Sequence, residues 1–471
     1  MKGGLNDALA AQQHQERVQR LFNLLNASAG KPGHVNAVSV LGTRHTRPEF
    51  LERAVASIMA SETMADVINS SQDVATKLQM FGIFDNVQVL LDRASDSDPI
   101  AAPDSINVIY QVNERNRFTI KTGTEIGNNE GTMNASLSIR NVFGGAEVLD
   151  TVASFGNRTS QAFQFVLSSP VNASPFSKID INAHHALRNN KLYSSYEELS
   201  RGMGLRYKTT SRFGYHELGY DCTWRSIDSI APTASMSIRD QAGHSLKSSL
   251  VHTFMRDCRD QTLLPTQGYY LRTTQELAGV MRLGNAQFFK TEIDGQFCHS
   301  LGGGQLLKDQ DQLFIHPGYT FSLTLRAGLL ADLNEKGSTV SDKFLLGGPL
   351  SVRGFKTAGI GPRDYKDALG GNAYWAAGLS MIAPIPKYES KPFRLHAFVN
   401  AGTSVPWAYG SDPGKLAESL IQSPSTSAGF GLIYQHAGLA RLELNYSIPL
   451  TAARGDQIHR GLQFGIGVDF L

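Results

Sequence analysis

The sequence predicts an all-β transmembrane barrel of about 16 antiparallel strands, preceded by one small α+β domain. Helical periodicity disappears after Asn116, and from there to the end apolar and polar residues alternate. The alternating segments are about ten residues long, which is the length that crosses a bilayer at a tilt. The composition agrees, because charged residues make up only 18% of the chain, while 45 Gly, 24 Phe and 15 Tyr favour turns and strands.

The first 33 residues are predicted to form a helical N-terminal extension. Apolar residues recur at helical spacing between Leu5 and Leu25, with Gln and charged residues between them. This pattern favours a helix that docks on the next domain over one that lies on a membrane surface. The segment lacks the apolar stretch of a secretory signal, and Asp7 and Glu16 are unusual in a mitochondrial matrix presequence. We therefore expect the protein to reach a membrane from the cytosol.

Residues 34–115 are predicted to form the α+β domain. Pro48 suits the first turn of a helix, and Gly82 suits the end of another. Between and around them, alternating apolar residues indicate strands. The expected elements are a strand over 35–41, helices over 49–59 and 65–80, and strands over 84–91 and 105–112.

Residues 116–471 are predicted to form the barrel. The clearest strand runs from Arg441 to Leu450, with Leu, Leu, Tyr and Ile on one face and Arg, Glu, Asn and Ser on the other. In a soluble sandwich the polar face would point to water, whereas in a membrane barrel it would line a wet lumen. The alternation fits both, but sandwich strands are nearer five or six residues in length. About sixteen candidate strands at about 22 residues each, connections included, favour the membrane barrel.

No motif of a catalytic or metal site occurs in the sequence. Nucleophile-elbow, zinc-protease and phosphate-loop motifs are all missing. The 44 basic and 42 acidic residues nearly balance, so nothing suggests a nucleic-acid surface. The three Cys are odd in number and widely spaced, which fits neither a zinc site nor a disulfide framework. We therefore expect a protein that is not an enzyme and needs no cofactor or metal.

The most informative segment is the longest connection without a strand pattern, residues 331–370. Within it, the stretch 343–355 has three consecutive apolar residues, then turn-forming residues, and then Arg353. A loop this hydrophobic is not expected to remain in water. We predict that it folds into the barrel lumen, where the guanidinium of Arg353 meets a group on the wall.

The tetrapeptide Val352-Arg-Gly-Phe355 resembles the loop signature of the BamA-type superfamily of barrel assembly and translocation proteins. In that superfamily the loop tucks into the lumen. Residues 370–384 are similar to the strand that follows the loop, and residues 398–402 are similar to the next strand. The C-terminal stretch 463–470 is similar to the β-signal of mitochondrial barrels, polar-x-Gly-hydrophobic-x-hydrophobic-x-hydrophobic, at every position. The α+β domain resembles one polypeptide-transport-associated (POTRA) repeat.

The resemblance implies a set of site residues. The loop motif consists of Val352, Arg353, Gly354 and Phe355. Its wall contacts are expected to be Ser380 and Asn400, which stand where the bacterial relatives carry acidic residues. The shell around the loop arginine is therefore expected to be neutral, with a loop carboxylate on Asp342, Asp364 or Asp367 as a candidate to complete it. The β-signal and gate residues are expected to be Gln463, Gly465, Ile466, Val468 and Phe470 on the last strand, with Phe118, Thr119, Ile120 and Lys121 on the first.

One POTRA-like domain and a mitochondrial-type β-signal make the chain most similar to the core barrel subunits of the mitochondrial sorting and assembly machinery, SAM. The resemblance implies insertion and folding of β-barrel precursors in the mitochondrial outer membrane, by lateral opening between the first and last strands. It places the POTRA domain in the intermembrane space. The implied partners are β-barrel precursors, two peripheral cytosolic SAM subunits, the TOM complex, the cristae-organising MICOS complex and the lipid bilayer.

Two alternatives remain open from the sequence. The first is a polypeptide-translocating pore of the same superfamily, which would move unfolded chains through its lumen. Substrate crosslinks to lumen residues such as Arg441 or Glu443 would favour that pore, whereas crosslinks to the first and last strands would favour lateral insertion. The second alternative is a soluble all-β enzyme or binding module, which partition into detergent micelles would exclude.

Overall fold

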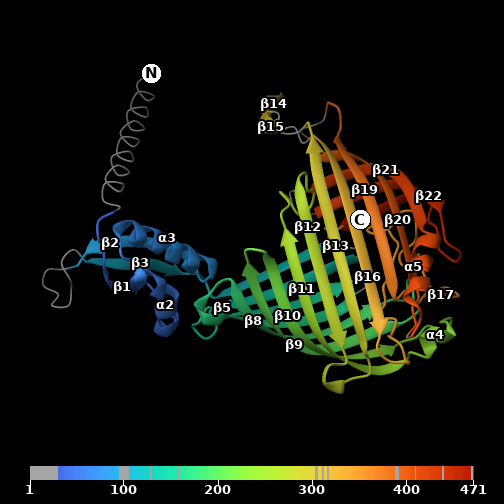
Figure 1. Ribbon diagram of the computed structural model, residues 1–471, viewed down its shortest axis with the longest axis horizontal. Coiled ribbons are helices and arrows are strands. Elements are labelled where there is room, and N and C mark those ends of the chain that lie inside the picture. Colours follow the sequence, from blue (N-terminus) through green and yellow to red (C-terminus); the bar gives the residue numbers. More distant parts are fainter. Residues whose placement is uncertain are drawn as a thin grey trace. The chain divides into compact units, whose positions relative to one another are not determined.

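The computed structural model describes residues 30–94, 105–127, 130–156, 159–302, 306–309, 312–315, 318–387, 392–408, 410–436, 440–467 and 470–471. The chain divides into two compact units (Figure 1). One contains the residues up to 119 together with 138–149 and 167–179, and the other contains the rest. The helix predicted between Leu5 and Leu25 lies outside the described residues. No helix in the described part of the chain is both long and apolar enough to cross a membrane.

The first unit is built on a three-stranded sheet of order β1-β3-β2, in which β1 runs parallel and β2 antiparallel to β3. Pro48 occupies the first turn of its first helix, and the Thr63 hydroxyl caps the second by accepting from the Asp66 N–H. The elements follow the predicted order of strand, helix, helix, strand and strand. They are β1 (Val35–Leu41), α2 (Pro48–Val55), the 3₁₀ turn η1 (Ala56–Ala60), α3 (Met64–Met80), β2 (Phe84–Arg93) and β3 (Ile106–Glu114).

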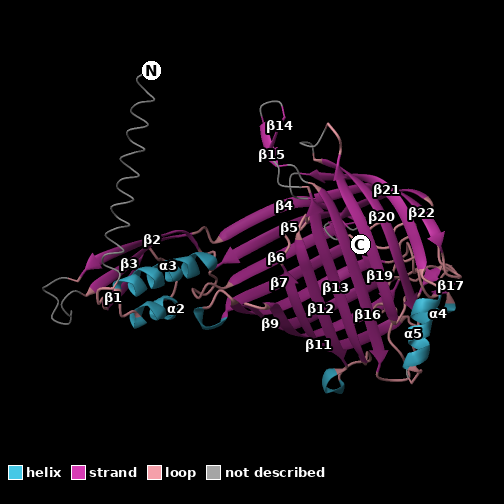
Figure 2. Cartoon of the chain, turned by 45° about the horizontal axis from the view of Figure 1, so that its top comes forward, coloured by secondary structure: helices cyan, strands magenta, loops and turns pink. Residues whose placement is uncertain are grey.

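A single sheet of 16 strands forms the barrel, and this is the strand number that the sequence predicts (Figure 2). Each strand lies beside its predecessor in the sheet, from β4 at one end of the order to β23 at the other. The strands are β4 (Phe118–Gly127), β5 (Glu130–Arg140), β6 (Val148–Gly156), β7 (Thr159–Pro170), β8 (Ser177–Asn189), β9 (Glu197–Ser211), β10 (Gly214–Asp228), β11 (Gly243–Asp257), β12 (Gly268–Ala278), β13 (Phe288–Leu301), β16 (Tyr319–Asp332), β19 (Ala373–Pro384), β20 (Phe393–Val405), β21 (Ser425–His436), β22 (Ala440–Thr451) and β23 (Gly461–Gly467).

Short elements occupy several connections between these strands. They are η2 (Val171–Ala173), α4 (Met236–Arg239), η3 (Val280–Arg282), the hairpin of β14 (Leu306–Asp309) and β15 (Gln312–Ile315), the two-residue strands β17 (Arg363–Asp364) and β18 (Asp367–Ala368), and α5 (Pro413–Gln422). The hairpin β17–β18 interrupts the long connection that the sequence predicts to be free of strands.

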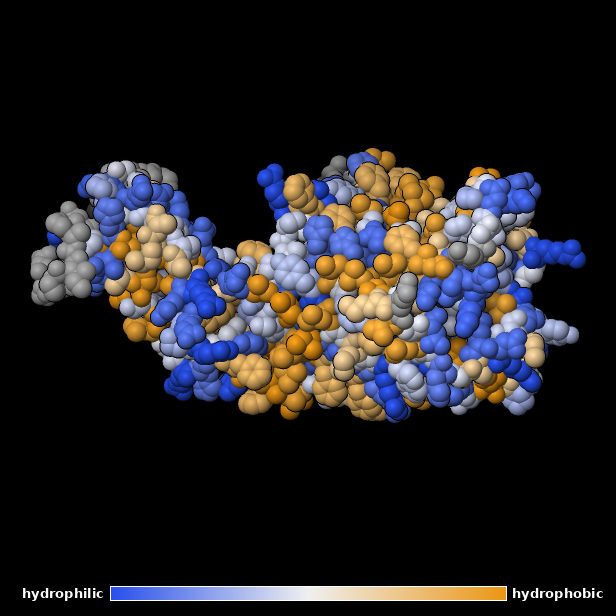
Figure 3. Space-filling model, turned by 60° about the horizontal axis from the view of Figure 1, so that its bottom comes forward, coloured by the Kyte–Doolittle hydropathy of each residue, from blue (hydrophilic) through white to orange (hydrophobic). Residues whose placement is uncertain are grey.

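The polar faces of the strands point into the barrel and the apolar faces point outward. On β22, Arg441 and Glu443 are buried, whereas Leu444 and Leu450 are 47% and 62% exposed. Figure 3 shows apolar side chains gathered on the outer surface of the barrel strands in that view. In a soluble sandwich the apolar faces would be buried between two sheets. The observed distribution is that of a membrane barrel with lipid around it, and it excludes the soluble all-β alternative.

Candidate functional site

The long connection between β16 and β19, residues 333–372, packs part of its length against the inner wall of the barrel. Gly402 of β20 leaves room for this packing, because a Cβ there would lie 3.0 Å from Val352 Cγ2. The apolar residues of the loop therefore form a small core inside the barrel. Its buried members are Leu346, Val352, Phe355 and Ile360 of the loop, Ala376 of β19 and Leu471.

Arg353 is fully buried and makes most of the polar contacts of the loop motif. Its Nε and Nη2 donate to one oxygen of Glu443 on β22, at 3.2 and 2.9 Å. Its Nη1 donates to the main-chain oxygen of Leu471 at 2.7 Å, and its guanidinium lies 4.9 Å from the ring centroid of Phe398. Arg441 pairs with the other oxygen of Glu443. One carboxylate thus lies between two arginines, neither of which loses its charge in a protein.

The surroundings of Arg353 differ from the neutral shell that the sequence predicts. Ser380 shares a hydrogen bond with His396 instead. Asn400 donates to a backbone carbonyl of the loop at 3.0 Å, so it holds the loop without touching the guanidinium. The prediction was wrong because another wall position, Glu443, supplies the counter-charge. A buried guanidinium requires such a partner, but any strand that faces the loop can provide it.

The three loop carboxylates proposed as candidates contact residues other than Arg353. Asp364 accepts hydrogen bonds from the hydroxyl of Ser237 at 2.7 Å and from its backbone N–H at 3.3 Å. Asp367 accepts from the backbone N–H of Ser235 at 2.7 Å. Both contacts fasten the β17–β18 hairpin to the segment around α4. These carboxylates therefore position the loop rather than neutralise Arg353.

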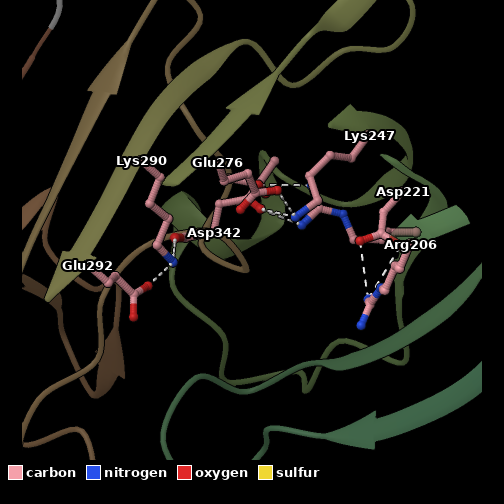
Figure 4. A network of polar contacts seen from close by, with 9 residues as sticks. Arg206, Asp221, Lys247, Glu276, Lys290, Glu292 and Asp342 are labelled. Carbon is pink, nitrogen blue, oxygen red and sulfur yellow. Dashed lines mark hydrogen bonds and ion pairs between the residues drawn. The ribbon is translucent and has the colours of Figure 1, made fainter. Parts of the chain in front are cut away.

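Asp342 forms a second charged anchor near the start of the loop (Figure 4). Arg225 of β10 donates to both carboxylate oxygens, each at 2.9 Å, and Lys247 of β11 lies 3.4 Å from one of them. Lys290 of β13 donates to the backbone oxygen of Asp342 at 3.0 Å. Burial by itself would raise the pKa of Asp342, but the charges of Arg225 and Lys247 prevail and lower it to about 2. Ion pairs thus hold the loop at two places, on β10 and β11 through Asp342 and on β22 through Arg353.

The two residues after Arg353 are hydrogen-bonded to the last strand. The backbone N–H of Gly354 donates to Gln463 Oε1 at 2.8 Å, and Gln463 Nε2 donates to the backbone oxygen of Phe355 at 3.0 Å. Gly354 has a φ of +85°, and a Cβ there would lie 2.9 Å from the Cβ of Ser427, so glycine is required. The structure therefore brings the loop motif into contact with the polar residue of the predicted β-signal.

Phe470, the last residue of the predicted strand, is placed differently from the prediction. The sequence extends this strand to Phe470. The structure describes β23 over Gly461–Gly467, and Phe470 lies outside the strand and is 5% exposed. The ring of Phe470 lies 4.6 Å from the guanidinium of Arg441 and 5.8 Å from that of Arg353. This cation–π contact and the burial of the ring account for the departure from the strand. Val468 lies outside the described residues.

The other predicted gate residues lie on β4 and β23. Gly465 is buried on the inward face of β23, and Ile466 is half-buried. On β4, Phe118 and Ile120 are 64% and 75% exposed. The remaining two β4 residues are Thr119, whose hydroxyl accepts a hydrogen bond from Arg140 at 2.8 Å, and Lys121, which is exposed.

Glu443 and Gln463 are two contacts of the motif that sequence reasoning did not assign to it. Alternation along β22 already indicates that Glu443 faces the lumen, and a buried carboxylate requires a cation. Several lumen arginines compete for that role, however, and Glu443 lies 90 residues from Arg353 in the chain. The partner is therefore decided by the path of the loop inside the barrel.

The protein is a 16-stranded membrane barrel. Its long loop folds into the lumen and binds the last strand of the barrel, and these two features define its class. Residues 141–470 match the Omp85 superfamily domain. The chain belongs to the Omp85 superfamily.

Curated relatives and solved structures agree with this assignment. A SAM50-like protein of Schizosaccharomyces pombe is 36% identical over 466 residues, which are 97% of this chain and 95% of that protein. The human sorting and assembly machinery component 50 homolog is 33% identical over 436 residues, with 91% of this chain and 89% of that protein covered. BamA from Haemophilus ducreyi, lacking POTRA domains 1–3, superimposes with a TM-score of 0.71 at 18% identity, over 92% of this chain and 83% of that one. This structural likeness concerns the fold.

Proposed function

We propose that the protein inserts and folds β-barrel precursors in the mitochondrial outer membrane, as its resemblance to sorting and assembly machinery subunits suggests. The seam between β4 and β23 opens laterally, and the C-terminal β-signal of a precursor pairs with an exposed strand edge. An open strand edge in lipid leaves unpaired N–H and C=O groups, each of which costs several kcal/mol. An incoming strand satisfies them by β-augmentation. The work is templating, and no bond of the precursor is made or broken.

The observation that carries the proposal is the attachment of the loop motif to the last strand. Gln463 of β23 is bound by the backbone of Gly354 and Phe355, and the neighbouring strand β22 is bound through Arg353 and Glu443. β23 is therefore held by its backbone ladder to β22 and by side-chain contacts from inside the lumen. A strand held by such contacts keeps its place while its other edge is available for exchange.

The proposal includes a location and partners. An even number of strands brings the start of β4 and the end of β23 to the same rim of the barrel. We place this rim and the α+β domain, as a POTRA repeat, in the intermembrane space. Two peripheral cytosolic SAM subunits, the TOM complex and the MICOS complex are the proposed partners, with the lipid bilayer around the strands.

Seam crosslinking tests the proposal. Cysteine pairs, one at residue 119, 120 or 121 and one at 467, 468 or 469, should form a disulfide where the register brings their Cβ atoms within about 4.5 Å. The disulfide should block the release of precursors, and its reduction should restore their release. An arrested precursor should crosslink to the same strands. Crosslinks confined to lumen residues Arg441 and Glu443 would instead support the polypeptide-translocating pore.

A further inference from the structure

An arginine and two aromatic rings lie together on the outer face of the barrel. Arg225 of β10 points inward, where it binds Asp342, so the adjacent Trp224 points outward. Arg201 of β9 is the register partner of Trp224 and lies on the same face, with its guanidinium carbon 5.6 Å from the ring centroid. The ring of Trp224 also stacks on that of His244 of β11, with the centroids 5.0 Å apart. A charged group therefore lies on the surface that faces lipid.

Two contacts fix the orientation of the Arg201 guanidinium. Its Nε donates to Nδ1 of His185 on β8 at 3.2 Å, and its carbon lies over the ring of Trp224. Within the described part of the chain, neither Nη1 nor Nη2 donates a hydrogen bond, and no carboxylate pairs with the guanidinium. Glu197, on the same face of β9, is paired with Lys191 at 2.8 Å instead. The edge that carries the two Nη atoms is therefore open. We call this set the outer cluster, and its members are His185, Arg201, Trp224 and His244.

The outer cluster lies near the depth at which lipid headgroups begin. β9 has 15 residues, which at about 3.3 Å per residue and a tilt of about 40° extend about 38 Å along the membrane normal. The apolar band of such barrels is about 25 Å tall, so both ends of the strand extend beyond it. Arg201 is the fifth residue of β9 and lies about 10 Å below the end of the strand, a few ångströms inside the band. From there a long arginine side chain reaches the phosphate layer, and Trp is enriched at the same level.

The open edge of Arg201 suits a phosphate group that is attached to acyl chains. The two Nη atoms present parallel N–H donors in a rigid plane, which match two phosphate oxygens in a bidentate pair. The same face of β9 continues toward the bilayer centre with Met203 and Leu205, which are 68% and 53% exposed. A molecule with a phosphate at one end and acyl chains at the other therefore meets the guanidinium and this apolar track together.

We propose that the outer cluster binds the phosphodiester of an anionic phospholipid, in the leaflet at the rim where β9 begins. Arg201 binds the phosphate, His185 holds the guanidinium by its Nε, and Trp224 covers one side of it. In phosphatidylcholine the quaternary ammonium of the headgroup offsets the charge of the phosphate, so an anionic lipid is favoured. This inference goes beyond precursor insertion, because β8 to β11 lie in the middle of the strand order, away from the seam between β4 and β23.

Fluorescence quenching by brominated lipids tests the outer cluster. The chain has three Trp, so Trp375→Phe and Trp407→Phe leave Trp224 as the single tryptophan of the full-length protein. The protein is reconstituted in phosphatidylcholine vesicles that contain phosphatidylglycerol or phosphatidylcholine with bromine near the headgroup end of the acyl chains. Because a bidentate pair adds two hydrogen bonds to a charged group, brominated phosphatidylglycerol should associate about tenfold more strongly than brominated phosphatidylcholine. Arg201→Gln should bring the two lipids within about twofold of each other.

Arg212→Gln is the matched control for this measurement. The guanidinium of Arg212 also lies 5.6 Å from an aromatic ring, that of Phe213, but it belongs to the turn between β9 and β10 at the opposite rim. This variant should keep the tenfold preference. Loss of the preference in both variants would assign it to the general surface charge and overturn the site.

Competition distinguishes a lipid from a soluble phosphate. An excess of inorganic phosphate should leave the preference as it is in sodium chloride of equal ionic strength. Loss of the preference in phosphate alone would assign the cluster to a soluble phosphate ligand and overturn the lipid.

The wild-type measurement stands on its own, because equal quenching by the two lipids would overturn the site. If the Arg201→Gln protein does not fold, as judged by heat-modifiable migration in gels, Arg201→Lys takes its place. An ammonium lacks the planar fork, so this variant should reduce the preference to about threefold. An unchanged tenfold preference would show that Arg201 does not bind the headgroup.

Discussion

Removing Arg353 and removing Glu443 should release the loop to different extents. Arg353→Ala leaves the carboxylate of Glu443 paired with Arg441, whereas Glu443→Ala leaves two buried guanidinium groups without a carboxylate. Removal of one member of a buried ion pair costs about 3–5 kcal/mol. We expect the cost of Arg353→Ala to lie near the lower end of this range and the cost of Glu443→Ala to lie near the upper end. Arg353→Lys should recover little, because an ammonium cannot reach Glu443 and the Leu471 carbonyl with a planar fork.

The opening of the loop can be measured by the reactivity of a buried cysteine. Ala358 of the loop is 4% exposed, so Ala358→Cys reports opening through its rate of maleimide labelling. The exposed Cys258 is replaced by Ser in this background. A loss of about 3 kcal/mol should raise the labelling rate about 100-fold, and the difference of about 2 kcal/mol between the variants should appear as about 30-fold.

Arg272→Ala is the matched control for this measurement. Arg272 also pairs with a lumen carboxylate, Asp294, but it is 42% exposed and lies on β12. Its removal should leave the labelling of Ala358→Cys unchanged, because the pair contacts no part of the loop and Arg272 remains partly in solvent, where an ion pair contributes about 0–1 kcal/mol. Faster labelling in Arg353→Ala than in Glu443→Ala would refute the charge argument. Wild-type labelling in both would show that the ion pair does not hold the loop.

Three further predictions concern the second anchor, the last strand and the topology. The pKa of Asp342 in the folded protein is about 2, below its ordinary 3.8, so the stabilisation that this carboxylate gives is present above about pH 4 and is lost as the pH falls through about 2. Pepsin cleavage of the loop should therefore rise over this pH window in the wild type. If the Asp342→Asn protein showed the same rise in cleavage, Asp342 would not be the anchor. Gly465→Val should impair assembly of the protein and of its precursors, because a Cβ at this position already lies 3.3 Å from the Phe470 ring, and normal growth and assembly would leave the β-signal without its assigned role. Protease added to intact mitochondria should spare residues 34–115, and cleavage there before rupture of the outer membrane would reverse the proposed topology.

The sequence by itself determined the architecture of this protein. The alternation of apolar and polar residues along segments such as Arg441–Leu450 indicates which residues face each side of a strand, because successive side chains of a strand point to opposite faces. Segment length and number then gave the barrel of about 16 strands. Helix signals such as Pro48 and Gly82 are local in the same way, and the order of the small α+β domain followed from them.

Tertiary structure decided the contacts of the loop. The polar faces of the strands could have met bulk water or a lumen. Which of the two they meet depends on how the whole sheet curves, and the pattern of a single strand does not reveal this. The carboxylate that pairs with Arg353 proved to be Glu443, and the backbone of Gly354 proved to bind Gln463, 109 residues away in the chain. Charges and carboxamides act over a few ångströms in any direction, so their partners follow from the path of the loop through the barrel and not from sequence spacing. The turn of Phe470 into the lumen has the same cause, since its arginine partners come together only in the folded barrel.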